Sequence, residues 1–309
     1  MCDTSYLSMN TQQGQSDFYR FSCQAMATTF EIYIAQASEY YAQNAAHSAF
    51  NLLNNLHNQL SRFIENSDIT RLNQAPAHEP VILNLDTFSV LQKAKDLYDI
   101  TSGAFDITIG VLTAHQLDKD SKPYTGRLTS APLKTGMEYL KLNIADIDAV
   151  RLHENIQIDL GAIGKGYALD CMAVHLREWG IHRALLHSGA STVLAMDPVP
   201  ESRGWPVTIS SPWQENMIIA ELCLQNCAVS GSAHIDHSHI INPDTGKLVH
   251  TTGTWSCCKH AASADALSTA LMVMSKQQID HLCKEYPDFS LAAAKNPNDI
   301  VFYGKWPLF

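Results

Sequence analysis

The sequence predicts an α+β fold in which a mixed sheet is covered by helices. Strand-like alternation recurs along the chain, amphipathic helical segments separate these strands at irregular intervals, and no internal repeat is visible. A regular strand–helix alternation would instead predict a doubly wound parallel sheet. The chain has 309 residues, 46% of them hydrophobic, which is enough to bury a large core. We therefore predict one domain over residues 18–309, preceded by a flexible tail of residues 1–17.

The predicted elements follow from hydrophobic periodicity and capping residues. Residues 30–35 (FEIYIA) alternate as in a strand, and residues 42–60 place Ala46, Ala49, Phe50, Leu53, Leu56 and Leu60 at helical spacing. A second helix is predicted from an N-cap at Asp86 to a stop before Gly103. Further helices are predicted over 167–179 and 265–276. Strands are predicted over 140–144, 156–160, 184–186, 207–209, 218–222, 239–242 and 254–258, and the polar residues 113–135 are predicted to form a surface excursion.

Composition excludes several classes of function. The chain has 31 acidic and 21 basic residues and no run of Lys or Arg, so a nucleic-acid partner is not expected. An acidic protein that binds phosphates needs a cation. We find no apolar run long enough for a transmembrane segment and no signal-peptide pattern at the start, and eight cysteines without zinc-type CxxC pairs indicate reduced thiols. These features predict a cytoplasmic location.

Residues 158–170 (IDLGAIGKGYALD) resemble a nucleotide-binding loop without matching one. Tyr167 stands where a P-loop has its lysine, and Leu169 stands where a dinucleotide-binding loop has its third glycine. Between a strand and a helix, these glycines would expose backbone N–H groups to phosphate oxygens beside the charge of Lys165. Asp159 could bind a sugar or a base edge. A plain tight turn with a solvated Lys165 is an equally open alternative.

A second motif, SADALSTALMVM, places Asp265 and Thr269 four residues apart, with Ser268 beside them. A helix would put the two oxygens on one face. Such hard oxygen ligands suit Mg²⁺, which completes its octahedron with water and substrate phosphates. The alternative is that Asp265 or Ser263 only caps the helix.

A third motif, SGSAHIDHSHIINPDTG, contains His234, His237 and His239. Zinc is one hypothesis, but no further Cys or His lies at a standard ligand spacing, and strand alternation would separate His234 from the other two. A histidine near a phosphoanhydride and an acceptor hydroxyl would instead serve as general base. His239, at the start of the predicted strand, is best placed for that role.

Together these motifs resemble the ApbE-like FAD:protein FMN transferases. The resemblance rests on six segments in the family's order: MATTF at 26–30, LSRFIENSDITRLN at 60–73, SGAFDITIGVL at 102–112, IDLGAIGKGYALD at 158–170, HIINPDTG at 239–246 and ADALSTALMV at 264–273. It implies an ApbE-like, T-fold-related fold. It also implies Mg²⁺-dependent transfer of FMN from FAD to a Thr or Ser hydroxyl of an acceptor flavoprotein, with release of AMP. An FAD pyrophosphatase that makes FMN and AMP, and a non-catalytic FAD-binding protein, are the alternatives.

The resemblance also assigns roles to residues. It implies that Met26 and Phe63 border the flavin, that Ala104, Phe105 and Asp106 line the FAD site, that Asp159 and Lys165 contact FAD, and that Ile241 closes the pocket. Mg²⁺ would be held by the Ala162 carbonyl with Asp265 and Thr269, and Ser268 stands where relatives often carry another oxygen ligand. Without the resemblance, Met26, Phe63, Phe105 and Ile241 would be interpreted as ordinary core residues.

Three positions depart from the family pattern. Relatives commonly have a tyrosine where Phe63 stands, a Gly-Gly pair where this chain has Gly189-Ala190, and an aromatic residue after SGS where it has Ala233-His234. These departures concern flavin stacking and the acceptor's approach more than the predicted magnesium site.

Overall fold

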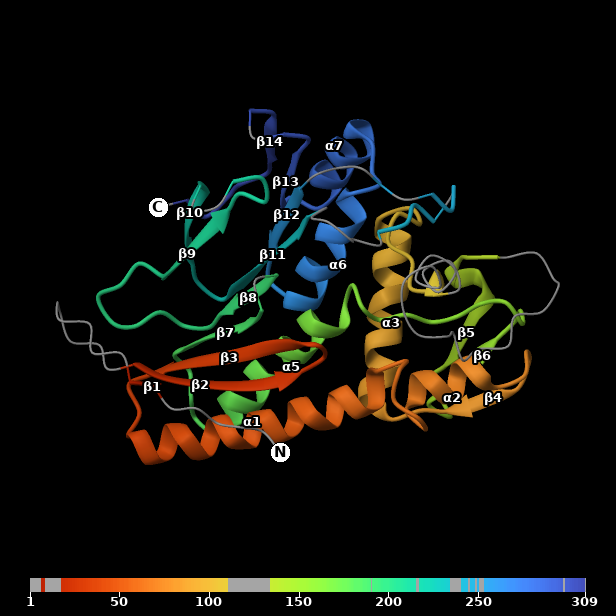
Figure 1. Cartoon of the computed structure of the whole chain (residues 1–309), viewed down its shortest axis with the longest axis horizontal. Helices are drawn as coiled ribbons and strands as arrows, with labels where there is room; N and C mark the ends of the chain where they lie inside the picture. The colour runs from red at the N-terminus through yellow and green to blue at the C-terminus, as the bar shows by residue number, and fades with distance from the viewer. Residues whose placement is uncertain are drawn as a thin grey trace.

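A nine-stranded sheet forms the centre of the molecule (Figure 1). The computed structural model describes residues 7–8, 18–110, 134–189, 191–214, 217–233, 240–243, 245–247, 249, 253–296 and 298–308. The sheet order is β1-β2-β3-β7-β8-β11-β12-β13-β14. Its strands are β1 (Leu7–Ser8), β2 (Phe18–Ala25), β3 (Thr28–Ala35), β7 (Ala184–Ser188), β8 (Thr192–Ala195), β11 (Cys227–Ala233), β12 (Gly253–Cys258), β13 (Ser290–Ala294) and β14 (Ile300–Tyr303).

All the strand pairs described in this sheet are antiparallel. The α+β class is confirmed, and the strand directions are more uniform than a mixed sheet implies. A parallel pairing is described only as an isolated bridge between Ile109 and Gln157. Antiparallel neighbours need no helical crossover, which explains the irregular order of strands and helices along the chain.

Helices cover one face of this sheet (Figure 1). They are α1 (Glu39–Leu60), α5 (Gly164–Glu178) and α6 (Ala261–Leu271), and α3 (Leu85–Ile100) packs beside them against α1 and α6. The buried side chains of these helices share one core with the inward side chains of β2, β3 and β7. Phe30, Ile32 and Ile34 belong to this core, because alternate residues of β3 point to the helical side. Helix α7 (Lys276–Glu285) contacts β13 and β14.

Smaller elements complete the fold. The hairpin of β9 (Trp205–Ser210) and β10 (Ile218–Leu224) packs on the opposite face of the sheet through a second core that includes Trp205, Leu222 and Trp255. A separate three-stranded sheet of β4 (Pro80–Ile82), β6 (Asp148–Arg151) and β5 (Leu140–Asn143) lies with α2 (Asp68–Gln74) and the short helix η1 (Met137–Tyr139).

Most predicted elements are confirmed. The strand 30–35 lies in β3, and the helix 42–60 lies in α1, which begins earlier because the Ser38 side chain accepts a hydrogen bond from the Tyr41 amide. The predicted strands 140–144, 184–186, 207–209, 218–222 and 254–258 correspond to β5, β7, β9, β10 and β12.

Three predicted boundaries are wrong. Asn84, not Asp86, is the N-cap residue of α3, and Asp86 lies in the first turn. Residues 156–160 form only the bridge at Gln157. The Ile158 amide donates to the Asn73 side chain, and the Asp159 amide donates to the Ile107 carbonyl oxygen, so no continuous strand forms. The predicted helix 265–276 divides, since α6 ends at Leu271 and Ser275 caps α7.

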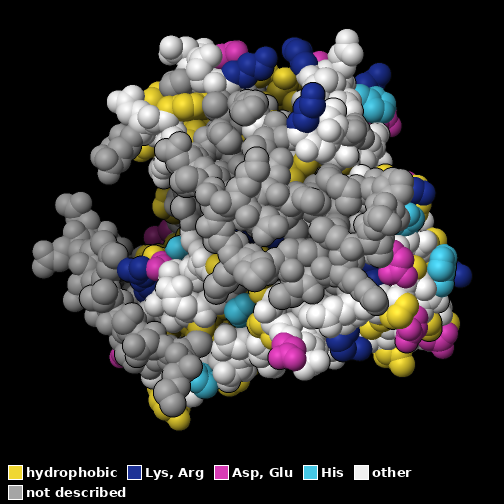
Figure 2. Space-filling view, turned by 45° about the vertical axis from the view of Figure 1, so that its right-hand side comes forward, with side chains coloured by type: hydrophobic (Ala, Val, Ile, Leu, Met, Phe, Trp, Pro, Cys, Tyr) yellow, Lys and Arg dark blue, Asp and Glu magenta, His cyan; other side chains and the backbone are white. Residues whose placement is uncertain are grey.

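Other predictions fall on residues that the structure does not describe. These are most of the excursion 113–135, the tail except Leu7–Ser8, and the start of the strand 239–242. Within the described chain, none of the helices has the length and apolarity required to cross a membrane. On the face in Figure 2, described basic side chains lie among acidic and histidine side chains instead of forming one basic surface.

Candidate active site

A cavity of about 410 Å³ lies between the loop after α3, the start of α5, the end of β11 and helix α6. Nine of the residues predicted for FAD or metal binding line it, although they come from distant parts of the sequence: Ala104, Phe105, Asp106, Asp159, Ala162, Lys165, Ile241, Asp265 and Thr269. The volume and the mixture of apolar and polar lining groups are typical of a small-molecule site.

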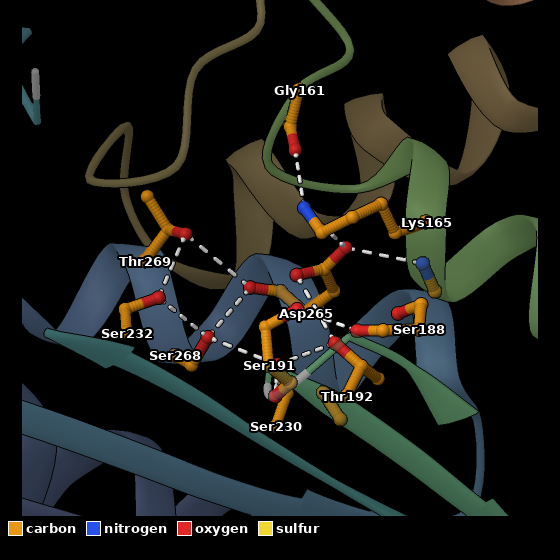
Figure 3. Close-up of polar contacts among 12 residues, drawn as sticks. Gly161, Lys165, Ser188, Ser191, Thr192, Ser230, Ser232, Asp265, Ser268 and Thr269 are labelled. Atoms are coloured by element: carbon orange, nitrogen blue, oxygen red, sulfur yellow. Dashed lines mark hydrogen bonds and ion pairs between the residues drawn. The ribbon is translucent and has the colours of Figure 1, made fainter. Parts of the chain in front are cut away.

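Asp265 is the central acidic group of this cavity. It lies inside α6, five residues after the N-cap residue His260, so the hypothesis that it only caps the helix is wrong. Its side chain is nearly buried, the Gly166 amide donates to Oδ2 at 3.1 Å, and Lys165 Nζ lies 3.8 Å from the same oxygen (Figure 3). The Thr192 hydroxyl lies 3.5 Å from Oδ1. A buried carboxylate with these partners is oriented for binding a cation or a charged ligand.

The start of α5 explains the glycines of residues 158–170. Helix α5 begins at Gly164, so Gly164 and Gly166 lie in its first turn, where a turn before the helix was predicted. A Cβ on Gly166 would lie 2.2 Å from the Ala261 carbonyl oxygen. Only glycine therefore allows α5 to approach α6 closely enough for its amide to reach Asp265.

Two hydroxyl groups near Asp265 occupy different positions. Thr269 Oγ1 lines the cavity, 3.4 Å from the Asp265 carbonyl oxygen and 3.3 Å from Ser232 Oγ. Ser268 is fully buried, donates to the Asp265 carbonyl oxygen at 2.9 Å and lies 2.9 Å from Ser232 Oγ (Figure 3). Ser232 lines the cavity, whereas Ser268 does not. Ser232 was not predicted from the sequence.

The donor set fits a hard cation. The Asp265 carboxylate, the Thr269 hydroxyl and Ala162 line one cavity, and carboxylate, hydroxyl and carbonyl oxygens are the ligands that Mg²⁺ prefers. Among the described residues there is no group of three or more His, Cys, Asp or Glu side chains that could hold a metal ion.

Charges of alternating sign continue along the cavity wall. Arg62 Nη2 lies 3.5 Å from Asp159 Oδ2, and Asp159 Oδ1 accepts from the Gly161 amide at 2.9 Å. Lys165 donates to the Gly161 carbonyl at 3.0 Å and lies beside Asp265. Arg62 was missed in the sequence, although it precedes Phe63 in a motif of the resemblance.

Asp106 faces the cavity from the loop after α3. Its Oδ1 accepts from the Thr108 amide at 2.8 Å and the Thr108 hydroxyl at 2.7 Å. Burial raises the pKa of Asp106 to about 6, against the effect of the bonds from Thr108, and the nearby Glu138 charge adds to the increase. Close to neutral pH this carboxyl can therefore accept or donate a hydrogen bond.

Met26, Phe63 and His239 are not among the described cavity-lining residues. Met26 and Ala27 form the two-residue turn between β2 and β3, and both have positive φ, which costs free energy in non-glycine residues. Phe63 is 82% exposed, with its ring 4.7 Å from the Arg62 guanidinium. His239 lies outside the described residues, as do His234 and His237, which the zinc hypothesis also requires.

Comparison with known proteins defines the class to which this fold and cavity belong. Residues 26–292 match the ApbE family, so the chain belongs to that family and the predicted resemblance is confirmed. A protein named FAD:protein FMN transferase from Vibrio cholerae serotype O1 is 28% identical over 276 residues, covering 82% of this chain and 80% of the relative.

Solved structures show the same fold. The flavin transferase ApbE from Vibrio cholerae superposes with a TM-score of 0.80 at 22% identity, covering 94% of this chain and 97% of that one. The ApbE protein from Thermotoga maritima also gives a TM-score of 0.80 at 22% identity, with the same coverage. The ApbE-like fold that the motifs predicted is therefore confirmed.

Proposed function

We propose that this protein transfers FMN from FAD to a Thr or Ser hydroxyl of an acceptor flavoprotein and releases AMP. The proposal rests on one observation: Asp265, Thr269 and Lys165 line the same cavity as the apolar residues Phe105 and Ile241. Charged and hard oxygen groups suit a pyrophosphate with its cation, and apolar groups suit the isoalloxazine ring. The names of the curated relatives support this substrate and this reaction.

The proposed FAD contacts come from two segments of the chain that line the same cavity. Ala104, Phe105 and Asp106 belong to one segment, and Asp159 and Lys165 belong to the other. We propose that Lys165 contacts the pyrophosphate, since its ammonium is already held between the Gly161 carbonyl and Asp265. Met26 and Phe63 would also border the flavin, although neither is among the described residues that line the cavity.

Asp265, Thr269 and the Ala162 carbonyl would hold Mg²⁺. The cation would supply neutralisation of the pyrophosphate charge and stabilisation of the leaving AMP. The Ser268 hydroxyl donates to the Asp265 carbonyl oxygen. This contact favours a role in orienting α6, which carries the proposed ligands, and disfavours direct coordination of the cation by Ser268.

The reaction exchanges a phosphoanhydride bond for a phosphoester bond. The acceptor hydroxyl oxygen bonds to the FMN phosphorus, the bond from that phosphorus to the bridging oxygen breaks, and AMP leaves with this oxygen. We propose that His239 accepts the hydroxyl proton as general base. FMN is carried to the acceptor without a redox change.

One experiment separates this function from its alternatives. The purified chain is incubated with FAD, Mg²⁺ and a candidate acceptor flavoprotein, and the acceptor's intact mass and the free flavins are measured. An FMN adduct on a Thr or Ser supports the transferase. Free FMN and AMP without an adduct indicate an FAD pyrophosphatase, and unchanged FAD indicates a binding protein. A parallel reaction with His239→Ala tests the base, with transfer expected to fall by roughly 10²–10⁴-fold while FAD still binds.

Two further proposals concern the chain as a whole. We propose that residues 18–309 form a single domain, supported by the continuous sheet from β2 to β14. The seven described cysteines are free thiols, which supports a reducing compartment, and we propose the cytoplasm.

A further inference from the structure

Four polar side chains form a cluster on the face of the large sheet opposite α1, α5 and α6. Glu31 of β3 and His187 of β7 are direct cross-strand partners, and Arg20 and Tyr33 are paired with each other beside them. His187 Nε2 lies 2.9 Å from Glu31 Oε2, and the Tyr33 hydroxyl donates to the same oxygen at 2.9 Å. Arg20 donates to both carboxylate oxygens. Glu31 is thus the centre of the cluster.

The second ring nitrogen of His187 also faces an acceptor. His187 Nδ1 lies 3.1 Å from the Gly189 carbonyl oxygen. Burial alone would raise the pKa of Glu31, but the bonds from Arg20 and Tyr33 and the His187 charge outweigh it and hold that pKa below its usual value. The Glu31 carboxylate and the Gly189 carbonyl oxygen are both acceptors, so each ring nitrogen of His187 faces an acceptor.

Gly189 begins the turn between β7 and β8, and this turn has little freedom. Gly189 has φ +56°, and a Cβ there would lie 2.3 Å from Thr28 Oγ1. Its amide donates to the Thr29 carbonyl at 2.7 Å. The remaining carbonyl oxygen of Gly189 is the one that His187 contacts. Strand β3 and His187 therefore fix the position of the turn.

The other end of this turn belongs to the cavity. Ser191 lines the cavity, and its carbonyl oxygen accepts from the Gly231 amide at 2.8 Å. Thr192 contacts Ser230 at 2.9 Å and Asp265 Oδ1 at 3.5 Å (Figure 3). A displacement of the turn would therefore move the cavity wall beside Asp265.

We propose that His187, held between Glu31 and the Gly189 carbonyl, is a positioning residue that sets the β7–β8 turn and through it the cavity wall beside Asp265. The inference rests on the proposed function, because FAD binding is used to detect a change in the cavity wall. FAD affinity should therefore depend on the contact between the His187 ring and the Gly189 carbonyl oxygen.

Two amide substitutions separate the two contacts of the ring. In His187→Asn the short side chain places its N–H₂ group near the position of Nδ1, so it can donate to Gly189 and cannot reach Glu31. In His187→Gln the amide extends toward Glu31 and leaves the Gly189 carbonyl without this donor. FAD affinity is measured by quenching of flavin fluorescence.

We expect His187→Asn to bind FAD within about 3-fold of the wild type, because its amide still donates to Gly189. His187→Gln should bind about 10-fold more weakly, as expected for one lost hydrogen bond. Tyr33→Phe is the matched control, because it removes a donor to Glu31 and leaves the His187–Gly189 contact, and its affinity should be unchanged. Equal affinities of the Gln and Asn variants would overturn the inference.

Nuclear magnetic resonance of the His187 ring in the full-length protein provides an independent measurement. A hydrogen bond between the ring and the Gly189 carbonyl oxygen, and Gly189 and Ser191 amide shifts that change in His187→Gln and not in Tyr33→Phe, are expected with or without FAD. If His187→Gln does not fold, the ring signals of the wild type decide: absence of this hydrogen bond rejects the inference. A wild type that binds no FAD would reject the proposed function, while the ring signals would still test His187.

Discussion

Of the carboxylates that line the cavity, Asp265 and Asp106 have different surroundings although both are more than nine-tenths buried. Asp265 lies on helix α6 beside the Lys165 ammonium and the Gly166 amide. Asp106 lies on a loop and is held by Thr108, two residues further along the chain, with another acidic group, Glu138, nearby. Burial and neighbouring groups together therefore decide what a carboxylate can do. Burial, with the Glu138 charge nearby, raises the pKa of Asp106 to about 6, whereas Asp265 is contacted by an ammonium and a backbone amide.

The largest expected effect tests the Asp265 side. Asp265→Asn keeps the shape of the side chain and removes its charge, so FMN transfer should fall about 10³-fold and the response to Mg²⁺ should be lost. Initial rates over a Mg²⁺ series measure this. Asp280→Asn makes the same change on an exposed side chain of α7 and should leave the rates unchanged. Nearly normal transfer by Asp265→Asn would show that the carboxylate only supports the structure.

The next effect tests the Asp106 side through pH. The folded-state pKa of Asp106, about 6, lies above its ordinary value of 3.8. The folded protein therefore keeps this proton at pH values where the unfolded chain has lost it. The stability contribution of Asp106 should be present below pH 4 and decrease by about 3 kcal/mol as the pH rises through 6. In Asp106→Asn this decrease should be absent.

Urea unfolding of both proteins at pH 4.5 and pH 7.5 measures the difference. Asp68 provides a control of opposite sign. Burial would raise its pKa, but hydrogen bonds from Asn84, Thr87 and Arg71 outweigh burial and lower it. Asp68→Asn should therefore remove stability that is present at neutral pH and lost as the pH falls. Equal pH profiles of the wild type and Asp106→Asn would contradict the electrostatic contrast with Asp265.

A smaller effect is expected at Lys165. Lys165→Ala should weaken FAD binding by about 1.5–3 kcal/mol, roughly 10–100-fold, because a charge-assisted contact with the pyrophosphate is lost. FMN binding should weaken less, since FMN lacks the second phosphate. Lys141→Ala, on an exposed position of β5, is the control. Equal weakening for FAD and FMN would place Lys165 away from the pyrophosphate.

The smallest effect concerns the hydroxyl groups of α6. Ser268→Ala should lower the free energy of unfolding by about 1 kcal/mol and leave the Mg²⁺ requirement unchanged, because its hydroxyl faces the Asp265 backbone. Thr269→Val should instead raise the Mg²⁺ concentration needed for transfer. The reverse result would make Ser268 the metal ligand.

The sequence motifs predicted much of the cavity because each motif keeps its chemical groups on one short segment. Asp265 and Thr269 are four residues apart, so they share one face of α6 wherever that helix packs. Residues 104–106 are adjacent in the sequence and stay together in any fold. Periodicity predicted α1 and the centre of β3 for the same local reason.

The missed features depend on distant segments. Ser232 reaches the cavity because β11 lies beside α6, and Glu31 meets His187 only through the register of β3 with β7. The close approach of α5 to Ala261 at Gly166 also involves a residue far away in the sequence. The pKa of Asp106 likewise depends on burial by other elements. No local pattern contains this information.

The contact between the Gly166 amide and Asp265 has a consequence for protein synthesis. These residues are 99 positions apart, so a nascent chain that has completed α5 still lacks the carboxylate of its cavity until α6 has left the ribosome. Contacts of such separation form late, because the intervening chain must first be ordered. A ligand that needs both helices therefore binds only the completed protein, and its binding energy stabilises the finished chain over every shorter intermediate.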